Sequence, residues 1–468
     1  MNPLWLALAC AHTPEAPVID ITTPPVVDSV PDYVPPVPTQ HELSNGSKVW
    51  IHAQSGLPLI SLRMVIQGGS AADPAGAPGT VSLSDAMLSR GAGDRDATSF
   101  AAEVERLALG LGADTLSTAT VVSLNAHSDQ LDAGLDLLAD LVLKPRFEED
   151  DLTRLKEIRV GELTEASDDA KTLAGWTMDQ LYFGASHPLA HPIEGTINSV
   201  KATTADGVRT SWAKRFGPEV TTFIVAGDVE NESLLAKLEE RFGGWSKGDR
   251  SRTTIGAPPT HAGDDRFFFV DKPGTSQTAL RVMMPAPTMN DSASAPAELG
   301  AIILGGTFTS RLNQLLREEK GYTYGARSTY VGKENFGYLS ASTNVQREVS
   351  GPALMELLSE LKRYQEGITE AELPKAQGAW QTRAVSSMES RASISYNFAG
   401  LAIDDLPVDT LGVELKAAKN ADVASVNASV QSSNVDNAIV VVVGDLEKIQ
   451  SEIEKAVPAA WQVVQTVE

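Results

Sequence analysis

The sequence of 468 residues contains a single cysteine, Cys10, and only seven histidines. One thiol excludes an intramolecular disulfide framework and any metal site built from several cysteines. Basic residues are also scarce, because 38 Lys and Arg stand against 61 Asp and Glu, which gives a formal net charge of −23. This deficit argues against nucleic acid as a partner, since phosphate binding requires clustered cations. No stretch approaches the ~20 apolar residues that a membrane-spanning helix needs.

The N-terminus combines a short apolar run, residues 3–9, with Cys10 directly after it. This arrangement resembles a bacterial lipoprotein signal, in which the cysteine carries the lipid. Leu8 stands where a small residue is usual and no basic residue precedes the run, so the alternative is a frayed N-terminus with an ordinary cysteine. Eight prolines follow within residues 11–39, a density that favours an extended spacer. We therefore predict a lipoprotein signal over residues 1–10 with lipidation at Cys10, a tether over 11–39, and attachment to a membrane.

An internal repeat organises the rest of the chain. Residues 223–245 resemble residues 439–461: in both, a β-branched run ends at Gly-Asp, an acidic amphipathic segment follows, and a tryptophan closes the unit. Asp228 and Asp445 are 217 residues apart, and two further pairs of similar segments upstream are offset by 221 residues. Landmarks at nearly constant spacing indicate duplication. We predict two homologous domains, 40–247 and 264–468, joined by a polar linker over 248–263.

Hydrophobic periodicity predicts alternating strands and helices within each domain. Strands are expected over 49–52, 59–66 and 121–125, where apolar residues alternate or run continuously. Helices are expected over 79–89, 98–109, 130–143 and 149 to about 165, where apolar residues recur at helical spacing. The expected class is α+β, with a mostly antiparallel sheet in each domain covered by helices on one face.

The order of several segments resembles a known family. LSNGSKVWI, VIQGGSAADPAGAPGT, LKPRFEEDDLTRLKE, HPLAHPIEGT and FIVAGDV follow one another as in the pitrilysin or insulinase-type zinc peptidases, particularly the mitochondrial-processing-peptidase-like branch. LGGTFTSRLNQLLREEKGYTYGARSTY resembles the C-terminal homologous domain of the same family. The resemblance covers about residues 40–468 and implies the two-domain fold of that family.

Active members of this family carry HxxEH on the helix after the glycine-bearing turn, where two histidines bind zinc and the glutamate activates water. The matching positions here are Ser82 and Ala86 for the histidines and Asp85 for the base. The third ligand corresponds to Glu162, 76 residues after Ala86. Alanine offers no ligand atom and a serine hydroxyl is a poor one, so we expect no zinc in this chain. Glu162 then becomes an ion-paired or solvated helix carboxylate, or, as a further alternative, joins Asp85 in binding a hard cation.

His187 and His191 have the i, i+4 spacing of zinc ligands on a helix. A proline follows each of them and disfavours helical geometry at the residue before it. We therefore expect a turn here and no zinc site. The sequence also lacks a GxSxG elbow, a P-loop and a dinucleotide fingerprint.

The resemblance implies retained function in the second domain. In active members an Arg, and a Tyr seven residues later, contact the substrate and stabilise the tetrahedral intermediate; Arg317 and Tyr324 have this spacing. The alternative is that Arg317 pairs with Glu318, Glu319 or another carboxylate and that Tyr324 is a half-buried strand residue. Gly305 and Gly306 resemble the glycine-bearing, substrate-handling segment of the non-zinc subunit of processing peptidases, although the segment is shorter here.

Together these features predict the non-catalytic subunit of a heteromeric zinc metallopeptidase. Its partner would be a homologous HxxEH-bearing chain that supplies zinc, and its ligand a peptide or unfolded segment in the cell envelope, on the periplasmic side. The alternative is a catalytically inert peptide-binding or scaffold protein of the same fold. The pair Arg317 and Tyr324 favours the first interpretation, because a scaffold has no need of it.

Overall fold

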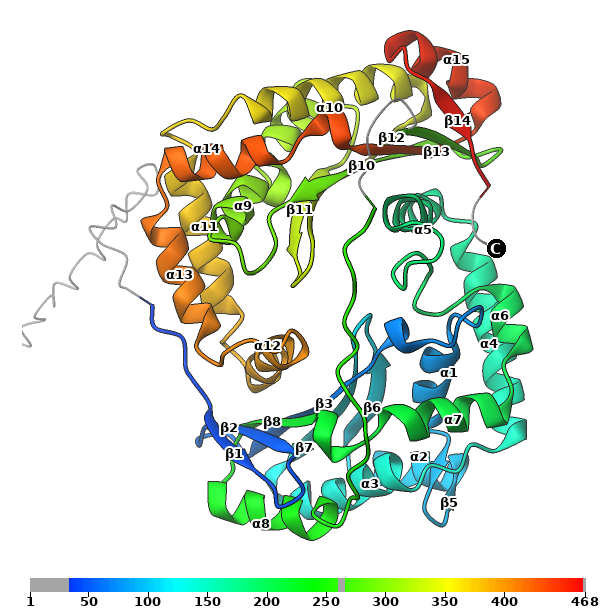
Figure 1. Cartoon of the computed structure of the whole chain (residues 1–468), viewed down its shortest axis with the longest axis vertical. Helices are drawn as coiled ribbons and strands as arrows, with labels where there is room; N and C mark the ends of the chain where they lie inside the picture. Colours follow the sequence, from blue (N-terminus) through cyan, green and yellow to red (C-terminus); the bar gives the residue numbers. More distant parts are fainter. Residues whose placement is uncertain (1–32, 260–265, 466–468) are drawn as a thin grey trace, which may run out of the picture. The chain divides into compact units, whose positions relative to one another are not determined.

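The computed structural model describes residues 33–259 and 266–465. From Pro35 onward the described residues belong to one compact unit that contains two six-stranded sheets with helices packed on them (Figure 1). We call the part before residue 260 the first half and the part after residue 265 the second half. None of the described helices is long and apolar enough to cross a membrane. Cys10 and the predicted lipoprotein signal lie outside the described residues.

The first sheet has the strand order β1-β2-β8-β3-β7-β6, in which β2 and β8 are parallel and the other neighbours antiparallel. Its strands are β1 (Thr39–Glu42), β2 (Lys48–Ala53), β3 (Leu59–Gln67), β6 (Gly110–Thr115), β7 (Ala119–His127) and β8 (Thr221–Gly227). A small hairpin joins β4 (Gly91–Ala92) and β5 (Arg95–Asp96). The helices are α1 (Thr80–Met87), α2 (Ala97–Arg106), α3 (Leu131–Leu143), α4 (Glu149–Ala166), α5 (Ala170–Phe183), α6 (Ile197–Ala202), α7 (Ala205–Arg215) and α8 (Asn231–Phe242).

The second sheet has the order β11-β12-β10-β13-β9-β14. Its strands are β9 (Phe267–Asp271), β10 (Gln277–Ala286), β11 (Ala326–Gly332), β12 (Gly337–Gln346), β13 (Ile439–Gly444) and β14 (Trp461–Val463). The helices are α9 (Ser294–Ala301), α10 (Ser350–Gln365), α11 (Leu373–Ser386), α12 (Arg391–Ile403), α13 (Thr410–Asn420), α14 (Val423–Ser432) and α15 (Leu446–Ala456). Two π-helical segments, Ile302–Gly306 and Asn313–Glu319, follow α9.

The two sheets have the same topology. β2-β8-β3-β7-β6 in the first corresponds to β9-β13-β10-β12-β11 in the second, and in both the first pair is parallel and the rest are antiparallel. This correspondence confirms the predicted α+β class with two homologous sheets. The exact domain boundaries stay a prediction, because both halves belong to one compact unit.

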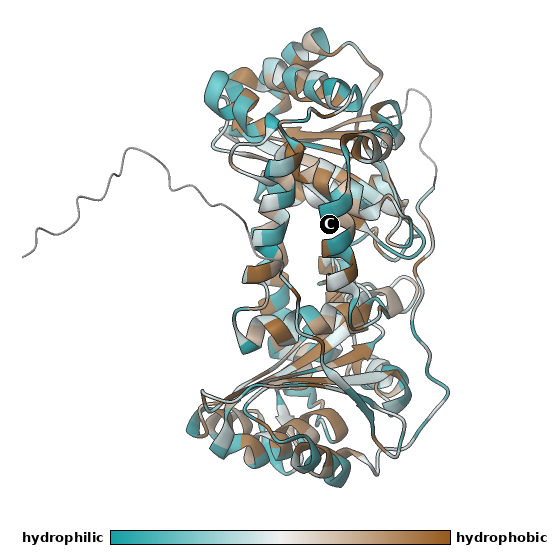
Figure 2. Ribbon diagram, turned by 90° about the vertical axis from the view of Figure 1, so that its left-hand side faces the viewer, coloured by the Kyte–Doolittle hydropathy of each residue, from teal (hydrophilic) through white to brown (hydrophobic). Residues whose placement is uncertain are grey.

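Each sheet buries one face under helices of its own half. In β3 the alternating side chains Leu62, Met64 and Ile66 join the core formed with α1, α3 and α8. Central strands β8 and β13 are buried along their whole length, which explains their continuous apolar sequence. Figure 2 shows the strands of both sheets largely in brown, the colour of hydrophobic residues.

The other face of each sheet is covered by a helix from the opposite half. Helix α5 packs against β13 and β10 of the second sheet, and α12 packs against β3 and β8 of the first (Figure 1). The contacts are apolar: Met178 lies in a cluster with Met283, and Phe398 in a cluster with Ile224. Sequence periodicity predicted helices on one face only, since it does not show which helix crosses to the other half.

We call α5 and α12, which each cover the sheet of the opposite half, the exchanged helices. An arginine at equivalent positions of β3 and β10 binds each of them. Arg63 donates from Nε to Ser395 Oγ of α12 at 3.2 Å, and Arg281 donates from Nη2 to the carbonyl oxygen of Lys171 in α5 at 3.2 Å. Both arginines lie opposite a serine of the neighbouring strand, Ser123 in β7 and Ser342 in β12. The duplication therefore extends to the polar contacts that hold the halves together.

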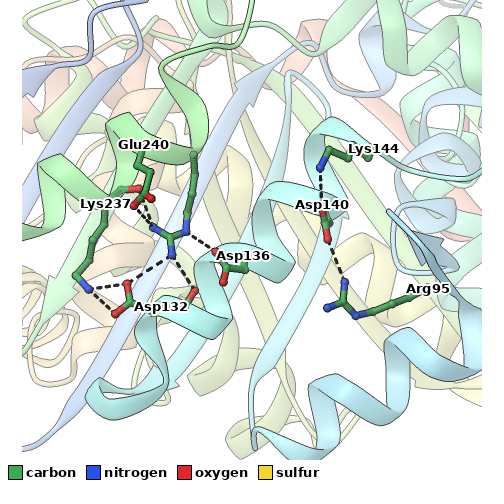
Figure 3. Close-up of polar contacts among 8 residues, drawn as sticks. Arg95, Asp132, Asp136, Asp140, Lys144, Lys237 and Glu240 are labelled. Carbon is green, nitrogen blue, oxygen red and sulfur yellow. Dashed lines mark hydrogen bonds and ion pairs between the residues drawn. The ribbon is translucent and has the colours of Figure 1, made fainter.

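Exposed ion pairs join α3 to α8 on the outside of the first half. Asp132 pairs with Lys237 and Arg241, and Arg241 Nε lies 2.7 Å from Asp136 Oδ1 (Figure 3). Further along α3, Asp140 pairs with Arg95 and Lys144. Such exposed pairs contribute about 0–1 kcal/mol each, so the two helices depend mainly on their apolar contacts.

Candidate functional site

Helix α1 contains the positions that correspond to HxxEH in active members of the family. Its first residue follows Gly79, whose φ of +83° requires glycine, and a side chain there would also meet the Glu194 carbonyl oxygen at 2.4 Å. The Asp73 carboxylate accepts hydrogen bonds from the backbone N–H groups of Gly79 and Val81, both at 2.7 Å. Burial nevertheless raises the pKa of Asp73 to about 6. Gly79 and the Asp73 carboxylate thus hold the start of α1 in place independently of the residues at the zinc-ligand positions.

Asp85, at the position of the catalytic base, is a buried structural residue. Its carboxylate lies 2.6 Å from Nη2 of Arg215, and it accepts hydrogen bonds from Thr115 and Thr120 hydroxyls at 2.7 and 2.6 Å. The side chains of Asp85 and Arg215 are 1% and 5% exposed. Arg215 also donates to the Gly68 carbonyl oxygen at 3.0 Å. Both charges have partners within the fold, and the Asp85 carboxylate is almost completely buried.

Ser82 and Glu162, two predicted remnants of the zinc site, are joined by Arg159. The guanidinium of Arg159 donates from Nη1 to Ser82 Oγ at 2.8 Å and lies 3.0 Å from Glu162 Oε2 through Nε. Ala86, the fourth position, packs against the first core and lines, with Arg159 and Glu162, a surface cavity of about 550 Å³. A cation of the protein itself therefore contacts the groups that would otherwise face the metal.

These residues do not fit a zinc ion. Zinc requires three converging nitrogen, sulfur or carboxylate ligands, whereas this chain offers a hydroxyl, a methyl group and one carboxylate already paired with Arg159. Within residues 33–259 and 266–465, no three His, Cys, Asp or Glu side chains are grouped so that they could hold a metal. The hard-cation alternative needed Asp85 and Glu162 together, but each is paired with a different arginine.

His187 and His191 lie in turns, as expected. His187 stacks on Phe183 with ring centroids 4.9 Å apart, and its Nε2 lies 3.1 Å from the Gly256 carbonyl oxygen. His191 contacts the backbone of the next residue. Both rings therefore have local structural contacts.

The second half contains a groove of about 850 Å³ beside β11 and β12. Gly305, Gly306 and Tyr324, all predicted site residues, line it. Gly305 is required by a close approach, because a side chain there would meet the backbone nitrogen of Ser328 at 2.3 Å. Tyr324 precedes β11 and is 94% exposed; the alternative of a half-buried strand residue is therefore wrong.

Arg317 adjoins this groove without lining it. Its guanidinium stacks on the ring of Phe308, 3.7 Å from the centroid, and Phe308 itself is a lining residue that is 65% exposed. Arg317 also forms the ion pair with Glu318 that the alternative interpretation named, at 3.4 Å. Its Nη1 atom is buried without a hydrogen bond among the described groups. The side chain is thus held in place by stacking on Phe308 and by the ion pair with Glu318, in which this same Nη1 atom takes part.

The predicted site residues thus form two groups. Ser82, Ala86 and Glu162 meet around Arg159 on α1 and α4, with Asp85 turned into the core; the other group surrounds the second-half groove. Sequence reasoning missed both arginines that neutralise the first group. Arg159 had a local signal, because it precedes Glu162 by one helical turn. Arg215 had none, since it lies 130 residues after Asp85.

Comparison with known proteins agrees with this picture. Residues 49–182 match the model of the insulinase family, peptidase family M16, and residues 202–379 match that of the peptidase M16 inactive domain. An uncharacterized zinc protease of Rickettsia bellii is 22% identical over 404 residues, covering 85% of this chain and 96% of that protein. The non-peptidase homolog YmxG of Helicobacter pylori is 24% identical over 375 residues, covering 78% and 84%.

A solved structure, the peptidase M16 inactive domain from Pseudomonas fluorescens, is similar over nearly the whole chain. Its TM-score is 0.80 at 26% sequence identity, covering 87% of this chain and 98% of that one. The two family models together span more than half of the sequence, and the helix that should carry the zinc ligands carries none. The chain therefore belongs to the insulinase family, peptidase family M16, and carries Ser82 and Ala86 where active members have the zinc-binding histidines.

Proposed function

We propose that this chain is the substrate-binding subunit of a heteromeric zinc metallopeptidase of the insulinase type. A homologous chain with an intact HxxEH supplies the zinc, and this chain supplies Arg317 and Tyr324 to the transition state. The substrates are peptides or unfolded segments in the cell envelope, where Cys10 anchors the chain to a membrane on the periplasmic side.

One contrast carries the proposal. The former zinc site is closed by internal ion pairs, whereas the second-half groove exposes Tyr324 almost completely. Two exposed aromatic rings, Tyr324 and Phe308, line the same groove, and grouped exposed apolar surface favours an interaction site over a packing role. A phenol hydroxyl and a positioned guanidinium can both donate to the oxyanion that develops during peptide hydrolysis. In the proposed complex the partner supplies the zinc ion, and this chain supplies the phenol and the guanidinium.

The test begins with purification of the tagged chain from its host and identification of the proteins that accompany it. Near-stoichiometric recovery of a homologue with HxxEH supports the proposal. Recovery of this chain alone, or of unrelated envelope proteins, supports the inert scaffold instead.

The reconstituted complex then permits a sharper test. Tyr324→Phe and Arg317→Ala should each lower kcat by about 10²-fold, the usual cost of losing one oxyanion donor, without dissociating the complex on gel filtration. Tyr396→Phe is the matched control, because Tyr396 is also exposed but lies on α12 over Arg63 of the first sheet. Unchanged turnover in both Tyr324→Phe and Arg317→Ala would refute the catalytic role.

A further inference from the structure

Part of the second sheet presents a polar face. Along β12, Leu339, Ala341 and Val345 are buried beneath helices of the second half, and the residues between them turn to the opposite face. On that face β11 and β12 carry a set of polar side chains, namely Arg327, Thr329, Ser340, Ser342 and Asn344. Helix α5 covers β13 and β10, so this polar part of the sheet forms one wall of the groove.

The groove is cationic although the chain as a whole is strongly acidic. Four cationic side chains line it and only one carboxylate does; they are Lys171, Arg281, Arg327, Arg383 and Glu298. Burial raises the pKa of Glu298, so this carboxyl group ionises less readily than a solvent-exposed one. The protein as a whole has a formal charge of −23, so this positively charged cluster is an exception. It favours an anionic ligand.

The four cations differ in their contacts. Arg383 lies 3.6 Å from Glu298 and donates to the Gly306 carbonyl oxygen, and Arg281 binds α5. Arg327 and Lys171 are exposed, and among the residues that the structure describes no hydrogen bond or ion pair joins either side chain to another group. Of these two free cations, only Arg327 has the planar guanidinium that matches a carboxylate with two parallel donors.

The internal duplication shows that Arg327 is additional to the framework. Arg327 lies opposite Ser342, which also lies opposite Arg281. In the first sheet the same row consists of Gly112, Ser123 and Arg63. The central-strand arginine is present in both halves, where it binds the exchanged helix, but the edge-strand arginine is present only in the second. The first half has Gly112 at the equivalent place, so the shared fold does not require an arginine there.

We propose that this groove selects peptide segments that carry a carboxylate, and that Arg327 is the residue that recognises it. The guanidinium can bind a carboxylate through two parallel hydrogen bonds, and the Ser342 and Thr329 hydroxyls lie on the same face beside it. Phe308 and Tyr324 line the same groove and provide apolar contact for neighbouring side chains of the peptide. The inference rests on the proposed peptide-binding function and adds the chemical class of the ligand.

The experiment measures fluorescence anisotropy of labelled peptides added to the purified full-length chain. The peptides are identical except for two central positions, which are Glu, Gln or Lys, and each has capped ends. A fourth peptide carries Gln at these positions with a free C-terminal carboxylate, which distinguishes a side-chain carboxylate from a terminal one. The protein variants are Arg327→Gln, Arg327→Lys and the control Arg106→Gln, which removes an equal charge from the exposed outer helix α2.

The Glu peptide, the free-terminus peptide or both should bind about fivefold to tenfold more tightly than the capped Gln peptide, as one partly exposed charge-assisted contact allows. Arg327→Gln should abolish this difference, Arg327→Lys should retain part of it, and Arg106→Gln should leave it unchanged. Equal affinities for all peptides, or a preference that survives Arg327→Gln, would overturn the inference while leaving peptide binding itself intact. A chain that binds none of the peptides would overturn both the inference and the peptide-binding part of the proposed function.

Discussion

The buried pair of Asp85 and Arg215 provides a decisive test of the claim that this helix has become structural. We expect Arg215→Met to destabilise the first half strongly, because it leaves the Asp85 carboxylate, with its side chain 1% exposed, without a counterion. Breaking a buried pair from one side costs about 3–5 kcal/mol. Replacing both residues, as in Asp85→Leu with Arg215→Met, removes both charges and should recover most of this loss.

Calorimetry can measure the effect. For a half of this size, 1 kcal/mol shifts Tm by about 2–4 °C, so Arg215→Met should lower Tm of the corresponding transition by about 6–20 °C. The double variant should unfold closer to the wild type than either single variant, which reveals the coupling. Asp206 and Arg209 provide the matched control, because they form an exposed pair at 3.0 Å on α7; Arg209→Met should shift Tm by no more than about 4 °C.

Two results would refute this reasoning. A shift for Arg215→Met as small as that for Arg209→Met would mean that Asp85 is solvated and free to act. Strictly additive single variants would mean that the two charges do not interact.

Two further predictions concern the second sheet. Burial raises the pKa of Asp179 to about 7 despite the nearby Arg281. Ionisation of Asp179 is therefore less favourable in the folded than in the unfolded chain, and its contribution to the free energy of unfolding should fall as pH rises from about 4 to 7. In urea titrations, Asp179→Asn should gain about 2 kcal/mol relative to the wild type between pH 5 and pH 8; a difference that stays constant with pH would contradict the assignment. Gly305→Ala should cost about 1–3 kcal/mol by forcing β11 outward, whereas Gly378→Ala in α11, where a side chain has open space, should stabilise by about 0.5–1 kcal/mol; equal thermal shifts for both would disprove the close approach.

The sequence predicted those elements whose periodicity is local. The strand expected over 59–66 is β3 (Leu59–Gln67), and the helices expected over 130–143 and 149 to about 165 are α3 and α4 within a few residues. The π-helical segments Ile302–Gly306 and Asn313–Glu319 were not predicted, because π-helix is rare and occurs mostly as single turns.

Long-range features explain most of what sequence reasoning could not supply. The absence of zinc ligands could be predicted from Ser82 and Ala86 alone, since their side chains lack the necessary atoms. The partner of Asp85 could not be predicted, because Arg215 lies on α7, far from Asp85 in the sequence, and only the folded structure brings the two together. The same holds for the exchanged helices: the sequence of α12 specifies an apolar face but not the sheet that receives it.

The exchange of α5 and α12 has a consequence for biosynthesis. The first sheet is complete once β8 has been made, but the helix that covers its second face begins at residue 391. At about 5–20 residues per second, ribosomes need on the order of 10–30 s to synthesise the intervening segment. During that time Trp50, Val65, Val121 and Ile224, which later contact α12, lack their cover. Until α12 has emerged, the nascent chain therefore exposes an apolar surface of the kind that promotes aggregation.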